Sequence, residues 1–385
     1  MKGHLVQMFH AGIDACRPAR VLPRHLPAAP AGRVVVLALG KAAAAMAKVA
    51  EDYYGARACG VAVVPHGICG DLDRIRLLFA AHPVPDEAGV AAAGQLLDLA
   101  AGAGPDDLVL TLLSGGASAL ACLPCEGLAL AGKQALTAAL LRSGAAIGEI
   151  NCVRRHVSRI KGGRLALAAA PARLLTLAIS DVDGPPEAIG SGPTLADPTT
   201  IADARAILDR YGLDAPLSET PKRVGGEFRI VAGAADALAA VAAEAERLGY
   251  RPILLGPCAG EAREVGRDHA RRALSAPPGT ALISGGELTV TVTGDGRGGP
   301  NLEYALAASL ALAGRSGISG LAADSDGTDG SSDAAGAFLV AGTEGAADAL
   351  AANDSGAWFA ARGALFVTGP TGTNVSDLRI ILIAP

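Results

Sequence analysis

Residues 34–41 read Val-Val-Val-Leu-Ala-Leu-Gly-Lys, an apolar run that ends at a glycine and a lysine. A helical pattern from Ala42 to Tyr54 follows, and the alternation of apolar run and alanine-rich helix repeats along the chain. Strands that are apolar on both faces are typical of a parallel sheet covered by helices on each side. The sequence therefore predicts an α/β protein whose first sheet is mostly parallel.

The other elements of this first part follow the same pattern. Strands are expected at residues 60–64, 75–79, 108–113 and 174–179, and helices at 86–101, 133–145, 149–158 and 163–169. Asp86 and Glu87 stand at the start of one helix, where the helix dipole favours negative charge. Because ligands of such sheets bind where the strands end, the segments of interest are residues 40–41, 114–118 and 180–181.

The stretch 214–226 is rich in proline, glycine and charge, and it divides the chain into expected domains at residues 1–224 and 225–385. Strands of the second domain are expected at 228–231, 252–255, 280–283, 288–293, 318–323, 364–367 and 378–383. Residues 288–293 alternate strictly between apolar and polar, which is typical of a half-exposed antiparallel strand. The second domain should therefore be a smaller α/β domain with a mixed sheet.

Composition excludes several classes of function. The net charge is −5, without a basic tail or an aromatic stacking set, which argues against nucleic-acid binding. No uncharged stretch of about 18 apolar residues is present, so a membrane span is not expected. Seven cysteines contain a single C-x-x-C pair, Cys122 and Cys125, with no second pair to complete a zinc site. We expect reduced thiols in a cytoplasmic protein that binds small molecules, and leave open whether it forms a homo-oligomer.

Three turns after strands are candidates for binding an anion. In residues 114–118, Ser-Gly-Gly-Ala-Ser, two glycines let backbone amides converge on phosphate oxygens. Gly40 and Lys41 join a strand to a helix start, where a lysine can reach an anion that the helix N–H groups also face. Residues 368–374 form a third such turn. Each turn also has a plain alternative, a surface lysine or an ordinary tight turn.

Charged residues supply further candidates. Arg155, Arg159 and Lys161 could line one side of a helix and its end, where arginine suits a carboxylate or phosphate. The alternative is a solvated basic face. Asp181 follows a strand and is placed for a general base or a metal ligand, with a turn aspartate as the alternative.

Residues 294–299 match G-x-G-x-x-G, and Asp324 follows at the distance of the ribose-binding acid of a dinucleotide fold. The main rival interpretation is therefore an NAD-type oxidoreductase. The polar face of the expected strand 288–293 argues against it, since a Rossmann first strand is buried on both faces. A hairpin edge that leads into a phosphate-contacting loop fits better.

Four carboxylates fall within residues 324–333, at Asp324, Asp326, Asp329 and Asp333. A hard cation such as Mg²⁺ would suit them. The alternative is an acidic turn that caps a helix through Ser331, Ser332 or Asp333.

Seven segments in this order resemble the glycerate 2-kinase family, the class II glycerate kinases with a C-terminal MOFRL domain. They are GKAA at Gly40, HPVPDEAG at His82, SGGASAL at Ser114, RIKGGRLA at Arg159, SGPT at Ser191, DGTDG at Asp326 and TGPTGTNV at Thr368. The resemblance covers the chain from about Val34 to the C-terminus. It implies a large Rossmann-like three-layer N-terminal domain and transfer of the ATP γ-phosphate, with Mg²⁺, to the 2-hydroxyl of D-glycerate or a related hydroxy acid.

The resemblance also implies roles for individual residues. Lys41 would stabilise the transferring phosphoryl group, and Asp181 would orient or deprotonate the substrate hydroxyl, or hold metal. Nucleotide and phosphate contacts would come from Gly40, Ser114, Gly115, Gly116, Ala117, Ser118, Gly296, Arg297, Gly298, Thr371, Gly372, Thr373 and Asn374. Substrate contacts would come from Arg155, Lys161, Ser191 and Glu303, and metal contacts from Asp326 and Asp329. We expect the turns to gather with Lys41 around one triphosphate between two lobes.

The chain departs from the family pattern in expected cleft loops. Where the family reads GGRNQE, residues 298–303 read Gly-Gly-Pro-Asn-Leu-Glu, so Pro300 replaces an active-site arginine and Leu302 replaces an amide. Arg297 could substitute for that arginine. Residues 183–186 are one residue shorter than the family's acidic stretch, and residues 64–67 replace another turn. A catalytically impaired homologue that binds a small anion or nucleotide therefore stays an alternative.

Overall fold

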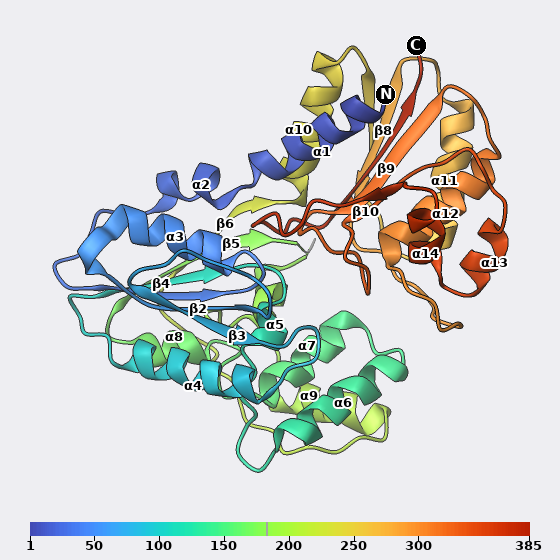
Figure 1. Cartoon of the computed structure of the whole chain (residues 1–385). Helices are drawn as coiled ribbons and strands as arrows, with labels where there is room; N and C mark the ends of the chain where they lie inside the picture. The colour runs from blue at the N-terminus through green and yellow to red at the C-terminus, as the bar shows by residue number, and fades with distance from the viewer. Residues whose placement is uncertain (182–183) are drawn as a thin grey trace. The chain divides into compact units, whose positions relative to one another are not determined.

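A computed structural model describes residues 1–181 and 184–385, and it divides into two compact units (Figure 1). The first unit comprises residues 21–180 and 184–231, and the second comprises residues 1–20, Asp181 and residues 232–385. The N-terminal helix α1 (Lys2–Ala15) therefore packs with the C-terminal half of the chain. The domain boundary near residue 224 stays a prediction.

The first unit is built on a sheet of six strands in the order β3-β2-β1-β4-β5-β6. The strands are β1 (Val34–Leu39), β2 (Ala58–Pro65), β3 (Ile75–Ala80), β4 (Leu108–Leu113), β5 (Arg173–Ser180) and β6 (Glu227–Gly233). Strands β1 to β5 run parallel, and β1 and β4 are fully buried, as their apolar sequences predict. This order is that of a doubly wound Rossmann fold, in which the strand order reverses between β1 and β4.

Strand β6 corrects one assignment made from sequence. Residues 228–231 were expected in the second sheet, because they follow the proline- and glycine-rich stretch. The structure adds them to the edge of the first sheet, beside β5. A strand is assigned by its hydrogen-bonding partner, which linker composition does not specify.

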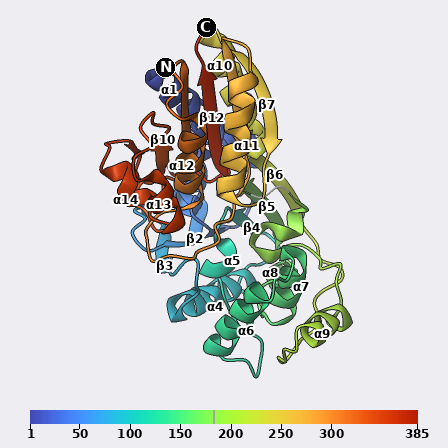
Figure 2. The same ribbon diagram turned by 90° about the vertical axis from the view of Figure 1, so that its right-hand side faces the viewer.

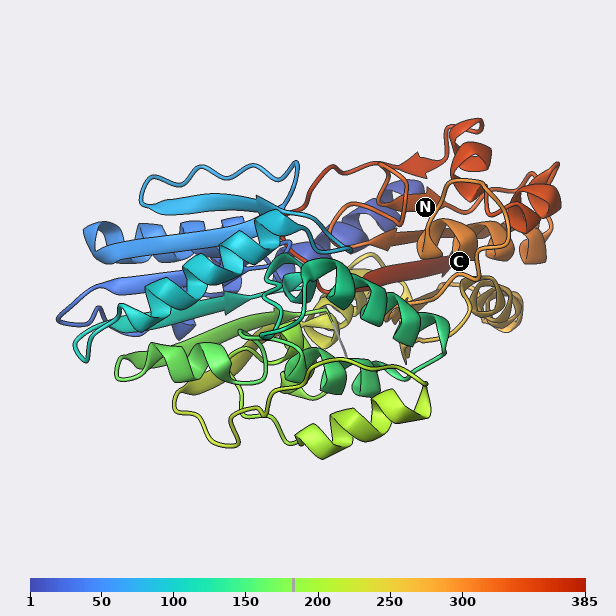
Figure 3. The same ribbon diagram turned by 90° about the horizontal axis from the view of Figure 1, so that it is seen from below.

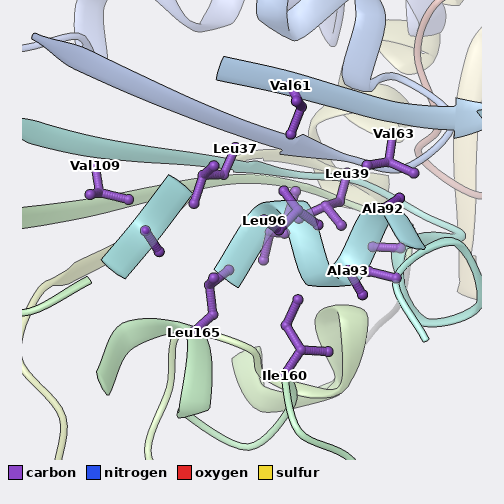
Figure 4. Packing of buried hydrophobic residues seen from close by; sticks show 14 of the residues in the cluster. Leu37, Leu39, Val61, Val63, Ala92, Ala93, Leu96, Val109, Ile160 and Leu165 are labelled. Atoms are coloured by element: carbon purple, nitrogen blue, oxygen red, sulfur yellow. The ribbon is translucent and has the colours of Figure 1, made fainter. Parts of the chain in front are cut away.

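Helices cover both faces of the first sheet (Figure 1). Helix α3 (Ala43–Tyr54) packs on β1 and β2, whereas α4 (Glu87–Ala101) and α8 (Arg164–Ala169) cover the opposite face. Alternate residues of a strand point to opposite faces, and Figure 4 shows Leu37 and Leu39 of β1 packed toward Leu96 of α4. The predicted start of α4 is confirmed, because Asp86 Oδ1 accepts a hydrogen bond from Gly89 N at 2.8 Å.

The remaining helices of the first unit form a separate cluster. Helices α6 (Leu130–Arg142), α7 (Ile147–His156) and α9 (Ile201–Arg210) lie together (Figure 3). They share an apolar core of their own, built around Leu140, Val153 and Ile207. The shorter elements are α2 (Pro18–Val21), η1 (Pro23–His25), η2 (Gly55–Arg57), α5 (Ala117–Leu120) and η3 (Pro186–Ser191).

The second unit contains a mixed sheet of six strands in the order β11-β10-β9-β12-β8-β7. The strands are β7 (Arg251–Pro257), β8 (Thr280–Gly285), β9 (Ile318–Asp324), β10 (Gly336–Phe338), β11 (Leu365–Phe366) and β12 (Asp377–Ile383). Only the β7–β8 pair among these neighbours is parallel. The predicted mixed sheet is thereby confirmed.

Two helix pairs cover this second sheet. Helix α1 packs beside α10 (Ala234–Arg247), and α11 (Ala262–Ser275) lies beside α12 (Pro300–Leu312) against the other face (Figure 2). Two short helices, α13 (Ala346–Ala351) and α14 (Ser355–Ala360), follow. In the described part of the chain, no helix has the length and apolarity needed to span a membrane.

The expected strand at 288–293 is not formed. Its residues form no regular strand, and one isolated parallel bridge links Thr289 to Glu261. Thr291 and Thr293 are exposed, and their hydroxyls donate to the side chains of Glu261 and Asn353. Alternation alone therefore gave a wrong assignment here.

Candidate functional site

The turns after β1 and β4 lie side by side at the point where the strand order of the first sheet reverses. Leu39 pairs with Leu113 at the carboxyl ends of these neighbouring parallel strands, so residues 40–41 and 114–118 leave the sheet together. In open α/β sheets this switch point is where ligands bind. The topology thus joins two segments that the sequence singled out separately.

Close backbone contact fixes the two turns to each other. Lys41 N donates to Gly115 O at 2.9 Å, and the buried Ser114 Oγ accepts from Ala42 N at 3.0 Å. Gly40 has φ 124°, and a Cβ there would lie 2.2 Å from Ser114 Oγ. Gly40 is therefore required by this contact, and the Ser114 hydroxyl joins the turns instead of pointing to a ligand.

Lys41 and Gly116 are half-buried and His82 is exposed, and the three lie together in this arrangement. Gly116 has φ 84°, and a Cβ on it would lie 3.1 Å from His82 Cδ2 and 3.5 Å from Lys41 Cγ. The Lys41 side chain therefore runs past the turn 114–118, as its predicted role requires. His82 was part of a quoted motif but received no role, although it lies just beyond the carboxyl end of β3 and follows the same positional rule.

A second set of contacts ties the turn 114–118 to residues 190–192. Ser118 Oγ and Ser191 Oγ are 2.8 Å apart, and Ser191 Oγ donates to Asn151 Oδ1 at 3.2 Å. Lys161 Nζ donates to Ser118 O at 2.8 Å, and Ala117 is buried against Gly190. The structure thus brings together the predicted residues Ala117, Ser118, Lys161 and Ser191.

The basic residues of 151–164 do not share one helix side, which corrects the sequence-based interpretation. Helix α7 ends at His156, Arg159 is exposed, and Arg155 and Lys161 are buried. Arg155 Nε forms an ion pair with Asp197 Oδ1 at 2.9 Å, and its Nη2 donates to Thr199 Oγ1. The guanidinium predicted to bind substrate is therefore held by an internal carboxylate. Burial of Arg155 and Lys161 could not be read from the charge pattern of the segment.

In the second unit, three loops that the sequence singled out pack against each other: residues 294–299, 324–333 and 368–376. Thr371 N donates to Asp326 O at 3.1 Å. Gly327 lies so close to Gly369 O that a Cβ on it would be 2.0 Å away. Gly298 N donates to Ser331 Oγ at 3.1 Å. The loops meet beyond the strand ends at one side of the sheet, where β9 ends and the antiparallel β12 begins.

Asp181 and Asn374, which are far apart in sequence, are joined within the second unit. Asn374 Nδ2 donates to Asp181 Oδ2 at 3.0 Å. Asp181 directly follows the last residue of β5. The amide therefore orients a carboxylate that was predicted to act as a base or metal ligand. By contrast, Thr373 is buried and its hydroxyl donates to Cys16 O at 3.1 Å.

Asp329 caps a helix, which corrects its predicted role as a metal ligand. Its carboxylate accepts from Asn301 N at 3.0 Å and from Leu302 N at 2.8 Å, at the start of α12. Burial, with the nearby Asp377 carboxylate, raises the pKa of Asp329 to about 7. Throughout residues 1–181 and 184–385, no three His, Cys, Asp or Glu side chains are grouped to hold a metal ion. The sequence had offered a helix cap in this loop as the alternative, but at Ser331, Ser332 or Asp333.

Two predictions for residues 298–303 also change. Leu302 is completely buried in the apolar core of the second unit. The leucine that stands where the family has an amide therefore affects core packing and does not line a cleft. Glu303 is buried in an ion pair with Arg263 at 2.7 Å, and its Oε2 accepts from Asn353 Nδ2 at 3.0 Å. The Glu303 carboxylate, which was predicted to contact substrate, thus binds other groups of the protein.

The G-x-G-x-x-G segment lacks the structural context of a dinucleotide-binding loop, because no strand leads directly into it. Its glycines instead allow close packing: a Cβ on Gly294 would lie 2.3 Å from Ala352 O, and one on Gly296 would lie 2.4 Å from Asp354 Cβ. Arg297 Nη2 donates to Ser331 O at 2.8 Å. This segment therefore gives no support to the NAD-type interpretation.

An open cavity of the first unit lies elsewhere. It is lined by residues that include Glu87, Cys125, Glu126 and Arg159, and Arg159 is the one sequence-predicted basic candidate among its lining residues. A much smaller cavity is lined by Ala117, Lys161 and Gly190. The position of the chemistry therefore follows from the strand order and the turns, not from cavity size.

Two family models match this chain. The first, described as a domain of unknown function (DUF4147), matches residues 4–224. The second, the MOFRL family, matches residues 280–377.

Curated relatives and a solved structure cover nearly the whole chain. A protein of Agrobacterium vitis, provisionally named a hydroxypyruvate reductase, is 46% identical over 98% of this chain and 94% of its own length. The D-glycerate 2-kinase of Thermotoga maritima is 39% identical over 100% of this chain and 98% of its own. A crystal structure of the Thermotoga maritima glycerate kinase superposes with a TM-score of 0.89 at 38% identity, covering 99% of each chain.

Proposed function

The chain belongs to the glycerate kinase family of phosphotransferases, and we propose that it transfers the γ-phosphoryl group of ATP to the 2-hydroxyl of D-glycerate or a related hydroxy acid. The observation that carries this proposal is the position of Lys41. Its side chain passes Gly116 and His82 at the switch point of the first sheet, where a ligand of such a fold binds.

Lys41 would supply the positive charge for phosphoryl transfer. The transition state spreads negative charge over the oxygens of the transferred group, so a fixed ammonium lowers the barrier more than it strengthens ground-state binding. The stem of Lys41 is held beside the left-handed backbone of Gly116, because a Cβ on Gly116 would lie 3.5 Å from Lys41 Cγ and 3.1 Å from the His82 ring.

Asp181 would accept the proton of the attacking hydroxyl. The substrate 2-oxygen forms a bond to phosphorus, the bond between phosphorus and the ADP oxygen breaks, and the hydroxyl proton passes to the carboxylate. The hydrogen bond from Asn374 Nδ2 to Asp181 Oδ2 would hold the carboxylate in one orientation for this step.

Mg²⁺ fits the donor set of the chain only as an ion carried largely by the nucleotide. Mg²⁺ keeps several waters and is held by one or two carboxylates together with substrate phosphates. Asp181 is a described carboxylate that could take this role, as the alternative to acting as the base. The ion would offset the charge of the phosphates.

A coupled ADP-release assay tests the proposal. Purified protein is given Mg-ATP and a panel of hydroxy acids that includes D-glycerate, L-glycerate, glycolate and D-lactate. We expect ADP release that depends on D-glycerate or a close analogue, and formation of the 2-phosphorylated acid by NMR. No ADP release with any acid of the panel would refute the proposal.

The same preparation separates the two alternatives. Binding of Mg-ATP or D-glycerate by calorimetry without turnover would indicate an impaired homologue, which the replacement of an expected arginine by Pro300 still favours. Oxidation of NADH by hydroxypyruvate would indicate the reductase named for the Agrobacterium vitis relative. We expect neither result.

A further inference from the structure

Lys161 is buried directly beneath the turn 114–118, and the inference drawn from it rests on the proposed function. We propose that Lys161 is a positioning residue: its ammonium group holds the turn 114–118 against residues 190–192, and its charge strengthens the binding of a substrate oxyanion on that turn. Lys161 was predicted to contact substrate directly, and the structure assigns its ammonium to the protein itself.

The contacts of Lys161 connect three segments. Its Nζ donates to Ser118 O at 2.8 Å and to Gly190 O at 3.4 Å. The backbone next to it is bound along the same side, because Gly162 N donates to Ser191 O at 3.2 Å and Gly163 N to Gly192 O at 2.8 Å. The side chain therefore extends from one anchored turn, across a second, to the carbonyl of the turn 114–118.

Little space surrounds this connection. Lys161 is 2% exposed, and a Cβ added to Gly190 would lie 3.3 Å from the Cβ of Ala117. Only a long unbranched side chain with hydrogen-bond donors at its end can pass between these turns and satisfy both carbonyls. The position of residues 114–118 therefore depends on the Lys161 ammonium.

The charge of Lys161 is not balanced within the protein. The charged and titratable groups that act on it are Lys133 of α6, Arg154 of α7 and the Cys122 thiol, and throughout residues 1–181 and 184–385 no carboxylate pairs with it. Burial, with the Lys133 cation, lowers the pKa of Lys161 to about 7. An oxyanion bound on the turn would provide the missing opposite charge, at a buried position where charge interactions are only weakly screened.

A linkage between anion binding and protonation follows. An anion near Lys161 favours the charged amine, so binding should raise its pKa and draw a proton from solvent above pH 7. Affinity for the anion should accordingly fall as pH rises through about 7, the value for the free protein. A lysine that serves only packing would produce neither effect.

Calorimetry on the full chain tests this. Binding of Mg-ATP, and separately of D-glycerate, is measured at pH 8 in two buffers that differ in ionisation enthalpy. We expect uptake of up to about one proton with the ligand whose oxyanion occupies the turn, which also distinguishes phosphate from carboxylate. Lys161→Met should abolish the uptake and weaken binding about tenfold or more, whereas Lys161→Arg should keep affinity that does not vary between pH 6 and 9.

Lys133→Met is the matched control. Lys133 is 4% exposed, and its ammonium donates to Val157 O at 3.2 Å rather than to the turn 114–118. Lys133→Met should retain proton uptake but shift it to higher pH, because the Lys133 cation helps to lower the pKa of Lys161 in the free protein. Melting curves identify any variant that does not fold. If Lys161→Met does not fold, the test compares the proton uptake and the pH dependence of affinity of wild type with those of Lys161→Arg.

The proposal is overturned if wild type binds neither ligand, if it binds without proton uptake, or if Lys161→Met takes up as many protons as wild type. These readouts need no turnover. Absence of ADP release with every acid would remove the proposed function, and proton uptake on Mg-ATP binding would still support the role of Lys161.

Discussion

The turn 114–118 and the loop 294–299 have similar sequences, because each combines glycines with polar residues, yet their glycines serve different purposes. Gly116 lies at the end of a buried parallel strand, in a left-handed conformation beside Lys41 and His82. Gly294 and Gly296 are pressed against the backbone near Ala352 and Asp354. The glycine of one segment lies beside two side chains that follow strands of the first sheet, and the glycines of the other let two loops touch.

The difference shows that the role of a glycine-rich motif depends on the element that precedes it. The turn 114–118 follows β4 at the switch point, where the ends of parallel strands are open to a ligand. The loop 294–299 follows an irregular segment and is fixed by neighbouring loops. Four predictions can break or sharpen this contrast, and they are ordered from the largest expected effect to the smallest.

Replacing Lys41 should have the largest effect. Lys41→Ala removes the cation beside Gly116, and we expect kcat/KM for phosphoryl transfer to fall about 100- to 1,000-fold, with the melting temperature unchanged. Lys48→Ala, on the exposed face of α3 where Lys48 pairs with Asp52 at 2.7 Å, is the control and should keep full activity. Equal turnover of Lys41→Ala and wild type would remove Lys41 from the site.

Alanine at the two kinds of glycine tests the contrast directly. Gly116→Ala places a methyl group at φ 84° beside His82, so kcat/KM should fall about tenfold or more, since small displacements at a site cost rate. Gly296→Ala should instead cost about 1–3 kcal/mol of stability by overpacking, with wild-type kcat/KM per folded molecule. Denaturant titration and steady-state kinetics measure both, and the reverse pattern would show that 294–299 is the ligand loop.

Leu302→Gln tests whether a departure from the family pattern is a matter of packing. Because Leu302 is completely buried among apolar side chains, the amide should cost about 1–3 kcal/mol. We expect no gain in turnover. Leu302→Met, which conserves volume, should cost less than about 1.5 kcal/mol. A more active Leu302→Gln enzyme would place residue 302 in the site after all.

The smallest effect concerns the pH dependence of stability through Asp329. Its pKa of about 7 in the fold lies above the ordinary 3.8, so its stabilising contribution is complete below about pH 3.8 and is lost as pH rises through about 7. The melting temperature of wild type relative to Asp329→Asn should therefore be higher at pH 5 than at pH 8. Asp326→Asn is the control, and identical pH profiles of wild type and Asp329→Asn would contradict the assignment.

The sequence predicted the first sheet well because its signals are local. The strands β1, β4 and β5 are continuous apolar runs, and Asp86 caps α4 as its position before the helix suggests. Helix α1 and strand β10 received no assignment. Residues 288–293 were assigned wrongly as a strand. Threonines can alternate with apolar residues along the chain while their hydroxyls bind another loop.

The candidate site was foreseen in part. Its segments were recognised because glycine, hydroxyl and lysine residues follow strands, but the sequence could not reveal which side chains other protein groups already engage. Arg155 is paired with Asp197, and Glu303 with Arg263. Both pairs join residues about 40 positions apart. The periodicity of a sequence carries no information about such long-range ion pairs.

By itself, the sequence determined the order and type of most elements and the positions of the turns between them, because strand and helix preferences depend on neighbouring residues. Only the tertiary structure decided that Lys41 meets Gly116 and His82, that Lys161 lies buried under a turn, and that Leu302 belongs to a core. Burial and long-range pairing depend on how distant segments pack. Those packed neighbours set the charge balance and the space available at each position.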